Sequence, residues 1–329
     1  MEKKKIILDC DPGIDDALAL MLALSSPELE ILGITTVSGN VPANLGADNA
    51  LRVLRFMGRL DIPVYCGAET PLVRDYVSAQ DTHGADGLGE SKIPMVQEIT
   101  WHTGAVDFIL HTLRTTPDLT IVAIGPLTNL AWALRNDKSA FQNLEQLLSM
   151  GGNYKSYGNC SPVAEYNYWC DPDAANEVFQ NLGKPIHMIG LDVTRQIVLT
   201  PNILEYMHIL NPQVAEFVRK ITRFYFDFHW KQEGIIGCVI NDPLAVAYMV
   251  NPDFCHGFDA YTVIETQGIC RGQSVVDAKN FWNKEPNSHV LTQTDPAAFM
   301  TMFLSRICGK EPSQIQTVLP QIMVGGRES

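Results

Sequence analysis

Residues 5–26, KIILDCDPGIDDALALMLALSS, contain a strand, a turn and a helix from which the fold can be predicted. KIILD, residues 5–9, is a short apolar run that predicts a buried strand. Pro12 and Gly13 interrupt it, and DDALALMLALSS, residues 15–26, predicts a helix. A strand followed at once by a helix is the beginning of a βαβ unit.

The same alternation continues along the chain. Predicted strands lie at 28–40, 63–67, 119–125, 144–152 and 185–194, and predicted helices at 43–60, 105–116, 126–136 and 171–183. This order favours an α/β fold with an open, mainly parallel, doubly wound sheet of Rossmann-like type. In such sheets ligands bind beyond the carboxyl ends of the strands, where Asp9, Asp11, Asn40, Met150 and Asp192 occur here.

After Thr200 the pattern becomes rich in helices. Helices are predicted at 202–210, 213–230 and 242–250, strands at 260–266 and 289–295, and a final helix at 296–307. Because no low-complexity linker and no internal repeat divides the chain, we expect residues 1–329 to form a single domain.

Composition narrows the class of protein. Hydrophobic residues make up 46% of the 329 residues and charged residues 19%, and the net charge is −13. A negative protein is a poor partner for nucleic acid or an anionic membrane. No apolar run is long enough for a secretory signal or a membrane helix. The eight cysteines form no C-x-x-C pair, so we expect reduced thiols in a soluble, cytoplasmic protein.

Four carboxylates, those of Asp9, Asp11, Asp15 and Asp16, fall within eight residues around the Pro-Gly turn. Carboxylates this close repel one another, and burying them adds a desolvation cost. A hard cation such as Ca²⁺ or Mg²⁺ removes that cost and prefers oxygen ligands. The alternative is that Asp15 or Asp16 only caps the helix, which would explain one or two of the four acids.

Six motifs in the chain occur in a known order. They are D-C-D-P-G-I-D-D at 9–16, V-S-G-N at 37–40, G-P-L-T-N at 125–129, M-G-G at 150–152, E-Y-N at 165–167 and D-P-L-A at 242–245. In this order they resemble the signatures of the inosine/uridine-preferring nucleoside hydrolases, which are calcium-dependent N-ribohydrolases. The resemblance implies the nucleoside hydrolase fold, a ribonucleoside substrate and a homodimer or homotetramer.

The resemblance also implies a metal site and a reaction. Calcium would be held by Asp11, Asp16, the main-chain carbonyl of Ile124 and Asp242. The reaction would be hydrolysis of the N-glycosidic bond of a purine or pyrimidine ribonucleoside to ribose and free base, in nucleoside salvage. Its transition state places positive charge on the sugar, as in glycoside hydrolysis.

Further roles follow from the same resemblance. Asp11 would take a proton from the attacking water, and Asp15 would accept a hydrogen bond from the ribose 2′-hydroxyl. The other implied substrate-binding residues are Asn40, Met150, Asn159, Glu165, Asn167 and Asn241. Each asparagine also has a simpler interpretation, because Asn40 follows a glycine and suits a turn, while Asn159 and Asn167 could form Asx-turns.

One position departs from the family pattern. The family's enzymes carry a histidine, thought to protonate the departing base, where this chain has Asn241. An amide is no acid at neutral pH. The candidate replacements are His229, with Tyr225 four residues earlier on the same helical face, and His83 in a glycine-rich loop. Trp230 offers stacking on the base instead. The simpler interpretations are that His229 and Tyr225 belong to an ordinary aromatic helix and that His83 lies in a flexible surface loop.

Two other functions compete with this one. A dehalogenase-type phosphatase also begins with a strand and D-x-D, but its motif requires Thr or Val two residues beyond the second Asp, where this chain has Gly13. No P-loop and no G-x-G-x-x-G is present, which leaves nucleotide triphosphates and dinucleotides without support. The second alternative is a catalytically impaired nucleoside-binding protein on the same fold, and the presence of Asp11 argues against it.

Overall fold

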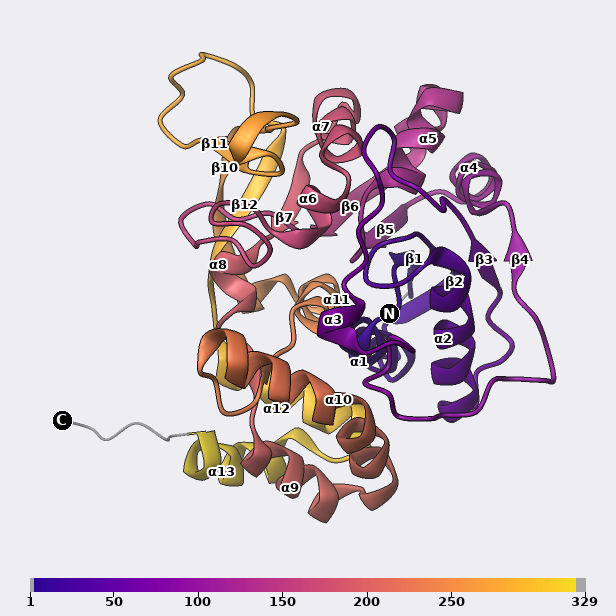
Figure 1. Cartoon of the computed structure of the whole chain (residues 1–329), viewed down its shortest axis with the longest axis vertical. Coiled ribbons are helices and arrows are strands. Elements are labelled where there is room, and N and C mark those ends of the chain that lie inside the picture. The colour runs from indigo at the N-terminus through magenta and orange to yellow at the C-terminus, as the bar shows by residue number, and fades with distance from the viewer. Residues whose placement is uncertain (1–2, 324–329) are drawn as a thin grey trace.

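The computed structural model describes residues 3–323, in which ten strands form one sheet (Figure 1). The strands are β1 Lys4–Cys10, β2 Leu29–Thr36, β3 Val64–Cys66, β4 His102–Thr103, β5 Leu119–Ala123, β6 Leu144–Met150, β7 Ile186–Ile189, β10 Cys255–Ile264, β11 Ser274–Asp277 and β12 Ser288–Thr294. Their order across the sheet is β11-β10-β12-β7-β6-β5-β1-β2-β3-β4. A separate pair consists of β8 Val198–Leu199 and β9 Cys238–Val239.

The sheet is mainly parallel, as predicted. All neighbouring pairs from β12 to β4 run parallel, whereas β10 pairs antiparallel with both β11 and β12 at one edge. In the central strand β1, Ile6 and Leu8 belong to the hydrophobic core on one side and Ile7 to the core on the other. A strand buried on both faces needs a continuous apolar run, and KIILD supplies it.

Helices cover both faces of the sheet, which confirms the doubly wound architecture. On one face lie α1 Ile14–Leu24, α2 Ala43–Phe56, α11 Asp242–Val250 and α12 Pro296–Cys308, and on the other α4 Ala105–Thr115, α5 Thr128–Asp137 and α7 Pro172–Asn181. The short helices are α3 Gln80–His83, α6 Tyr166–Cys170 and α8 Leu191–Thr194. Within residues 3–323 no helix is both long and apolar enough to cross a membrane.

The C-terminal part is helix-rich, again as predicted. Helices α9 Pro201–Leu210, α10 Pro212–Glu233 and α13 Pro312–Met323 gather with α12 at one end of the molecule (Figure 1). Helix α10 packs against α1 and α3, which places its C-terminal half above the strand ends. The prediction that 296–307 is the final helix is wrong, because α13 follows it.

Several predicted boundaries are also wrong. The strand predicted at 185–194 ends at Ile189, and Asp192 lies on α8. The helix predicted at 43–60 ends at Phe56, two residues before Gly58, which has a φ of +67°. Strand β10 begins at Cys255, before the predicted start, and β11 was not predicted. Both belong to the antiparallel edge, where solvent contact removes the continuous apolar signal.

The sheet reverses its order between β1 and β5. From β1 the chain proceeds through β2 and β3 to β4 on one side, and from β5 through β6 and β7 to β12 on the other. Such a switch point leaves a crevice beyond the carboxyl ends of the two central strands. Asp11 directly follows β1, and Ile124 directly follows β5. The topology therefore brings together the residues of two distant sequence motifs.

Candidate active site

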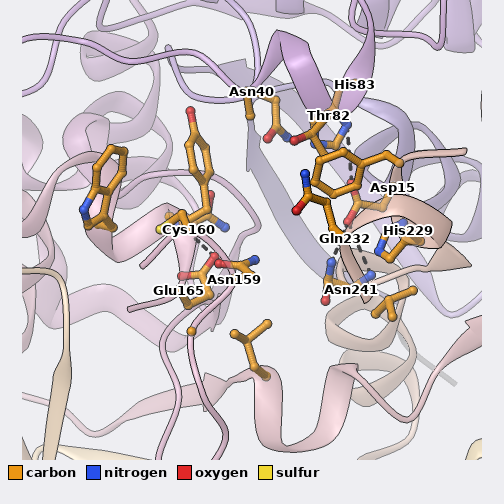
Figure 2. Close-up of a pocket in the computed structure, with 18 of the residues that line it drawn as sticks. Asp15, Asn40, Thr82, His83, Asn159, Cys160, Glu165, His229, Gln232 and Asn241 are labelled. Carbon is orange, nitrogen blue, oxygen red and sulfur yellow. Dashed lines mark hydrogen bonds and ion pairs between the residues drawn. The ribbon is translucent and has the colours of Figure 1, made fainter. Parts of the chain in front are cut away.

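A cavity of about 470 Å³ opens at these strand ends, and the predicted site residues surround it (Figure 2). The predicted residues that line it are Asp15, Asn40, His83, Ile124, Met150, Asn159, Glu165, Asn167, His229, Asn241 and Asp242. Asp11 and Asp16 are fully buried behind this lining, and both contact Asn40. The volume is typical of a site for a small molecule.

We call Asp11, Asp15, Asp16 and Asp242 the acid floor of the cavity. Asp16 caps α1, since its Oδ2 accepts a hydrogen bond from the Gly13 amide at 2.9 Å and its Oδ1 from the Asp11 amide at 3.1 Å. The capping interpretation is therefore correct for Asp16. It is wrong for Asp15, whose Oδ2 accepts from the backbone amide and the side-chain Nδ2 of Asn241, at 3.3 and 3.1 Å.

The carboxylate of Asp11 fits between two glycines. Its Oδ2 accepts a hydrogen bond from the Asn40 amide at 2.6 Å, and its buried Oδ1 has no partner within residues 3–323. A Cβ atom on Gly39 would lie 1.9 Å from Oδ2, and one on Gly125 would lie 2.6 Å from Oδ1. The sequence analysis missed both roles, although the two glycines stand inside the motifs V-S-G-N and G-P-L-T-N.

Burial and mutual repulsion act on the acid floor. Desolvation raises the pKa of Asp11 and of Asp242 well above the usual range for aspartate, and that of Asp16 to about 7. Neighbouring carboxylates raise each of these pKa values further. Side-chain oxygens of Asp15, Asp16 and Asp242 lie within 4.8 Å of one another. Oxygen-only donors together with the unpartnered Oδ1 of Asp11 suit a hard cation, so the acid floor could hold a metal ion.

Opposite the acid floor, Glu165 and Asn167 connect α6 to the sheet. Glu165 caps α6 and accepts hydrogen bonds from the amides of Asn167 at 2.7 Å and Gly152 at 2.8 Å, and burial raises its pKa to about 7. Asn167 lies on α6 rather than in an Asx-turn, and its Nδ2 donates to the carbonyls of Ile124 and Met150, both at 3.1 Å. Asn40 likewise does more than form a turn, because it donates to two acids of the floor.

We call His83, Tyr157, Asn159, His229 and Glu233 the rim of the cavity. Asn159 stays in a loop, as its simpler interpretation required, and lines the side opposite His229 (Figure 2).

Two residues of the α8 region organise this loop and the rim. The carboxylate of Asp192 accepts hydrogen bonds from three successive amides of residues 154–156, at 2.6, 2.7 and 3.0 Å. Arg195 donates to the Gly158 carbonyl at 3.0 Å, lies 3.7 Å from the Tyr157 ring centroid and pairs with Glu233 of α10 at 3.6 Å. The sequence analysis missed Arg195, Tyr157 and Glu233, for which no local pattern gives a signal.

Both candidate histidines lie at the cavity. His83 is 4% exposed on α3, so its interpretation as part of a flexible surface loop is wrong. His229 is equally buried, and its ring lies 4.4 Å from that of Tyr225, centroid to centroid. Burial lowers the pKa of both histidines. Trp230 is 59% exposed and is not among the described residues that line the cavity, which removes support for stacking on its ring.

Comparison with known proteins explains this arrangement. Residues 6–301 match the model of the inosine-uridine preferring nucleoside hydrolases. The chain belongs to this family. It is therefore an enzyme of a family that cleaves N-glycosidic bonds, and the phosphatase alternative is wrong.

Individual relatives agree with the family model. The chain is 35% identical to a pyrimidine-specific ribonucleoside hydrolase of Escherichia coli over 92% of this chain and 97% of that protein. The structure superposes on a purine-preferring ribonucleoside hydrolase of Gardnerella vaginalis with a TM-score of 0.88 and 34% identity, covering 93% of this chain and 98% of that one. It superposes equally well on a plant nucleoside hydrolase, with a TM-score of 0.88, 32% identity and coverage of 93% and 99%. These relatives differ in the base named for them, so the family fixes the reaction and not the base.

Proposed function

We propose that this nucleoside hydrolase cleaves purine or pyrimidine ribonucleosides to ribose and free base in nucleoside salvage. The observation that carries the proposal is the acid floor, where oxygens of Asp15, Asp16 and Asp242 converge beneath a cavity of about 470 Å³. A cavity of this volume with carboxylates and amides in its lining suits a small polar ligand such as a ribonucleoside.

We propose Ca²⁺ as the metal ion. Asp11, Asp16, Asp242 and the carbonyl of Ile124 would hold it, and only oxygen donors stand among them, as Ca²⁺ prefers. When bound, the ion would supply positive charge that offsets the buried carboxylates and binds ribose hydroxyls. Removal of the ion should therefore weaken substrate binding as well as catalysis.

The protein's own residues would orient the sugar and activate the water. Asp11, whose Oδ2 accepts a hydrogen bond from the Asn40 amide at 2.6 Å, would take the proton of the attacking water. Asp15 would accept the 2′-hydroxyl. Asn40, Asn159, Glu165 and Asn167 would bind the other hydroxyls, with Met150 and Asn241 against the substrate.

A panel of nucleosides tests this function. Purified protein should release reducing sugar from inosine or uridine, and a chelator should abolish the release until Ca²⁺ is restored. If no ribonucleoside of the panel yields ribose in the presence of Ca²⁺, the proposal is wrong. Binding of nucleosides without ribose release would favour the impaired binding protein instead, although all four acids of the floor are present.

Assembly and location remain predictions. We propose a homodimer or homotetramer that binds neither nucleic acid nor membranes and works in the cytoplasm. All eight cysteines lie in the described residues as free thiols, as a reducing compartment would leave them. Light scattering of the purified protein measures the oligomeric state directly.

A further inference from the structure

Two histidines line the same cavity and meet opposite kinds of backbone group. His83 binds the N-terminus of α1, where its Nδ1 lies 3.0 Å from the backbone nitrogen of Ile14, the first residue of that helix. His229 lies near the C-terminus of α10, where its Nδ1 is 3.0 Å from the carbonyl oxygen of Tyr225. These two bonds determine where each neutral ring carries its proton.

At His83 the backbone partner is a donor. An amide N–H can only donate, so Nδ1 of His83 accepts, and the single ring proton of His83 resides on Nε2. The Asp15 carboxylate is 4.0 Å from Nδ1, too far for a hydrogen bond. Protonation of Nδ1 would leave the Ile14 amide facing another N–H in a buried site, and the positive end of the α1 dipole opposes the charge. The structure thus keeps His83 neutral.

At His229 the backbone partner is an acceptor. A carbonyl can only accept, so Nδ1 of His229 carries the proton and Nε2 keeps its lone pair. Nε2 can therefore take a second proton without breaking the bond to Tyr225. Only this histidine can become an acid while every hydrogen bond that holds it stays intact.

The charged groups around His229 act in the same direction overall. Glu233, one turn further along α10, and Asp15, from α1, both favour protonated His229. Arg195, next to α8, opposes it, but Arg195 is itself paired with Glu233 at 3.6 Å. His83, from α3, stays neutral by the argument above. These groups and the Tyr225 carbonyl work against burial, which lowers the pKa of His229.

The residue at the family's usual acid position has another task. The Nδ2 of Asn241 donates to Asp15 at 3.1 Å, and its Oδ1 is buried with no partner in the described chain. That oxygen can accept a hydrogen bond from a substrate, but it has no proton to give. The proton for the departing base must therefore come from elsewhere in the cavity.

We propose that His229 is the general acid for the departing base and that His83 is a neutral hydrogen-bond donor to the substrate. The proposal rests on the proposed function. As the C1′–N bond breaks, its electron pair stays with the base, and His229 Nε2 gives a ring nitrogen of that base its proton. The water oxygen bonds to C1′, and the water's proton passes to Asp11. Nucleoside and water thus become ribose and free base, and solvent restores both side chains.

Matched variants separate the two histidines. His229→Asn keeps an N–H that can reach the Tyr225 carbonyl, and His83→Asn keeps an oxygen that can accept from Ile14, while both variants lose Nε2. We expect His229→Asn to lower kcat for inosine by about 10²–10⁴. The same variant should leave kcat for p-nitrophenyl riboside little changed, because the phenolate of that substrate departs without a proton. His83→Asn should affect both substrates alike.

The pH dependence gives a readout that a structural role would not produce. Protonated His229 is present below its pKa, so kcat of the wild type for inosine should fall as pH rises through a pKa below the ordinary 6.5. That fall should be absent for p-nitrophenyl riboside, and also for inosine in His229→Asn. Should His229→Asn fail to fold, His229→Gln, which also lacks an acidic group, takes its place in both measurements.

The outcomes are distinguishable from a failure of the proposed function. Wild-type protein that cleaves neither substrate overturns the function itself. Wild-type activity on both, with equal losses on both in His229→Asn, overturns the assignment of His229 alone. A loss confined to inosine in His83→Asn, with His229→Asn unaffected, overturns it as well and makes His83 the acid.

Discussion

The acid floor and the rim of the cavity are built in different ways. Asp11 and Asp16 are fully buried and are held by bonds within one strand–turn–helix segment and to the next strand end, at Asn40. The rim comes from α3, α10 and the loop that Asp192 and Arg195 hold, and its Tyr157 is 66% exposed. If the proposed function is correct, the floor would serve every nucleoside alike, whereas the two histidines of the rim would treat each base according to its chemistry.

The largest effect should follow from removal of a floor carboxylate. Asp242→Asn should abolish hydrolysis of all nucleosides and weaken Ca²⁺ binding in calorimetry, because it removes one of three converging carboxylates. Asp253→Asn, an exposed acid just after α11, is the matched control and should change neither. Undiminished Ca²⁺ affinity in both Asp242→Asn and Asp16→Ala would contradict the proposed ligands.

The second effect concerns the sugar. Ribonucleosides should exceed their 2′-deoxy counterparts in kcat/KM by about 10⁴–10⁵, because a site built for a hydroxyl leaves buried groups unpaired when the hydroxyl is absent. Steady-state rates on uridine and deoxyuridine, and on inosine and deoxyinosine, measure this ratio. Comparable rates within either pair would show that Asp15 does not bind the 2′-hydroxyl.

A smaller loss should follow from crowding Asp11. Gly39→Ala places a methyl group 1.9 Å from the present Asp11 Oδ2 and must displace that carboxylate. A shift of about 1 Å in a reacting group can cost about 10²-fold in rate. Gly183→Ala is the control, since its Cβ meets nothing within 4 Å, and its φ of +78° predicts a loss of about 1 kcal/mol in stability without loss of activity. Unchanged kcat in Gly39→Ala would contradict the placement of Asp11.

The smallest effect belongs to the rim. Asp192→Asn removes the charge that accepts three backbone amides and should loosen the loop that carries Asn159. We expect KM to rise about tenfold, which corresponds to about 1.4 kcal/mol, with kcat nearly unchanged. Thr116→Ala is the control, because Thr116 is half-buried at the C-terminal end of α4 and does not line the cavity, and it should change neither KM nor kcat. A collapse of kcat in Asp192→Asn would mean that the rim and the floor are not separable.

Some of the site could be predicted because its residues act through local sequence. Strand, Pro-Gly turn and helix follow one another in residues 5–26, so Asp11, Asp15 and Asp16 had to lie at one end of β1. Parallel strands bring their carboxyl ends to one edge, and this is why Asn40 and Ile124 join them. The antiparallel edge at β10 and β11 lacked that regularity, and its boundaries were predicted poorly.

The sequence by itself determined the doubly wound α/β class and the family, and it grouped Asp11, Asp15 and Asp16, because those depend on short-range patterns and on motifs in a set order. Asp9, which the sequence grouped with them, lies outside the acid floor and accepts hydrogen bonds from Thr35 and Asn129. Only the tertiary structure decided which acid caps α1, which glycines admit Asp11 and which nitrogen of each histidine carries the proton. His83 meets Ile14 across 69 residues of sequence, and Arg195 meets Glu233 between two separate helices. The protonation of an imidazole depends on whether its neighbour is a donor or an acceptor, and only folding chooses that neighbour.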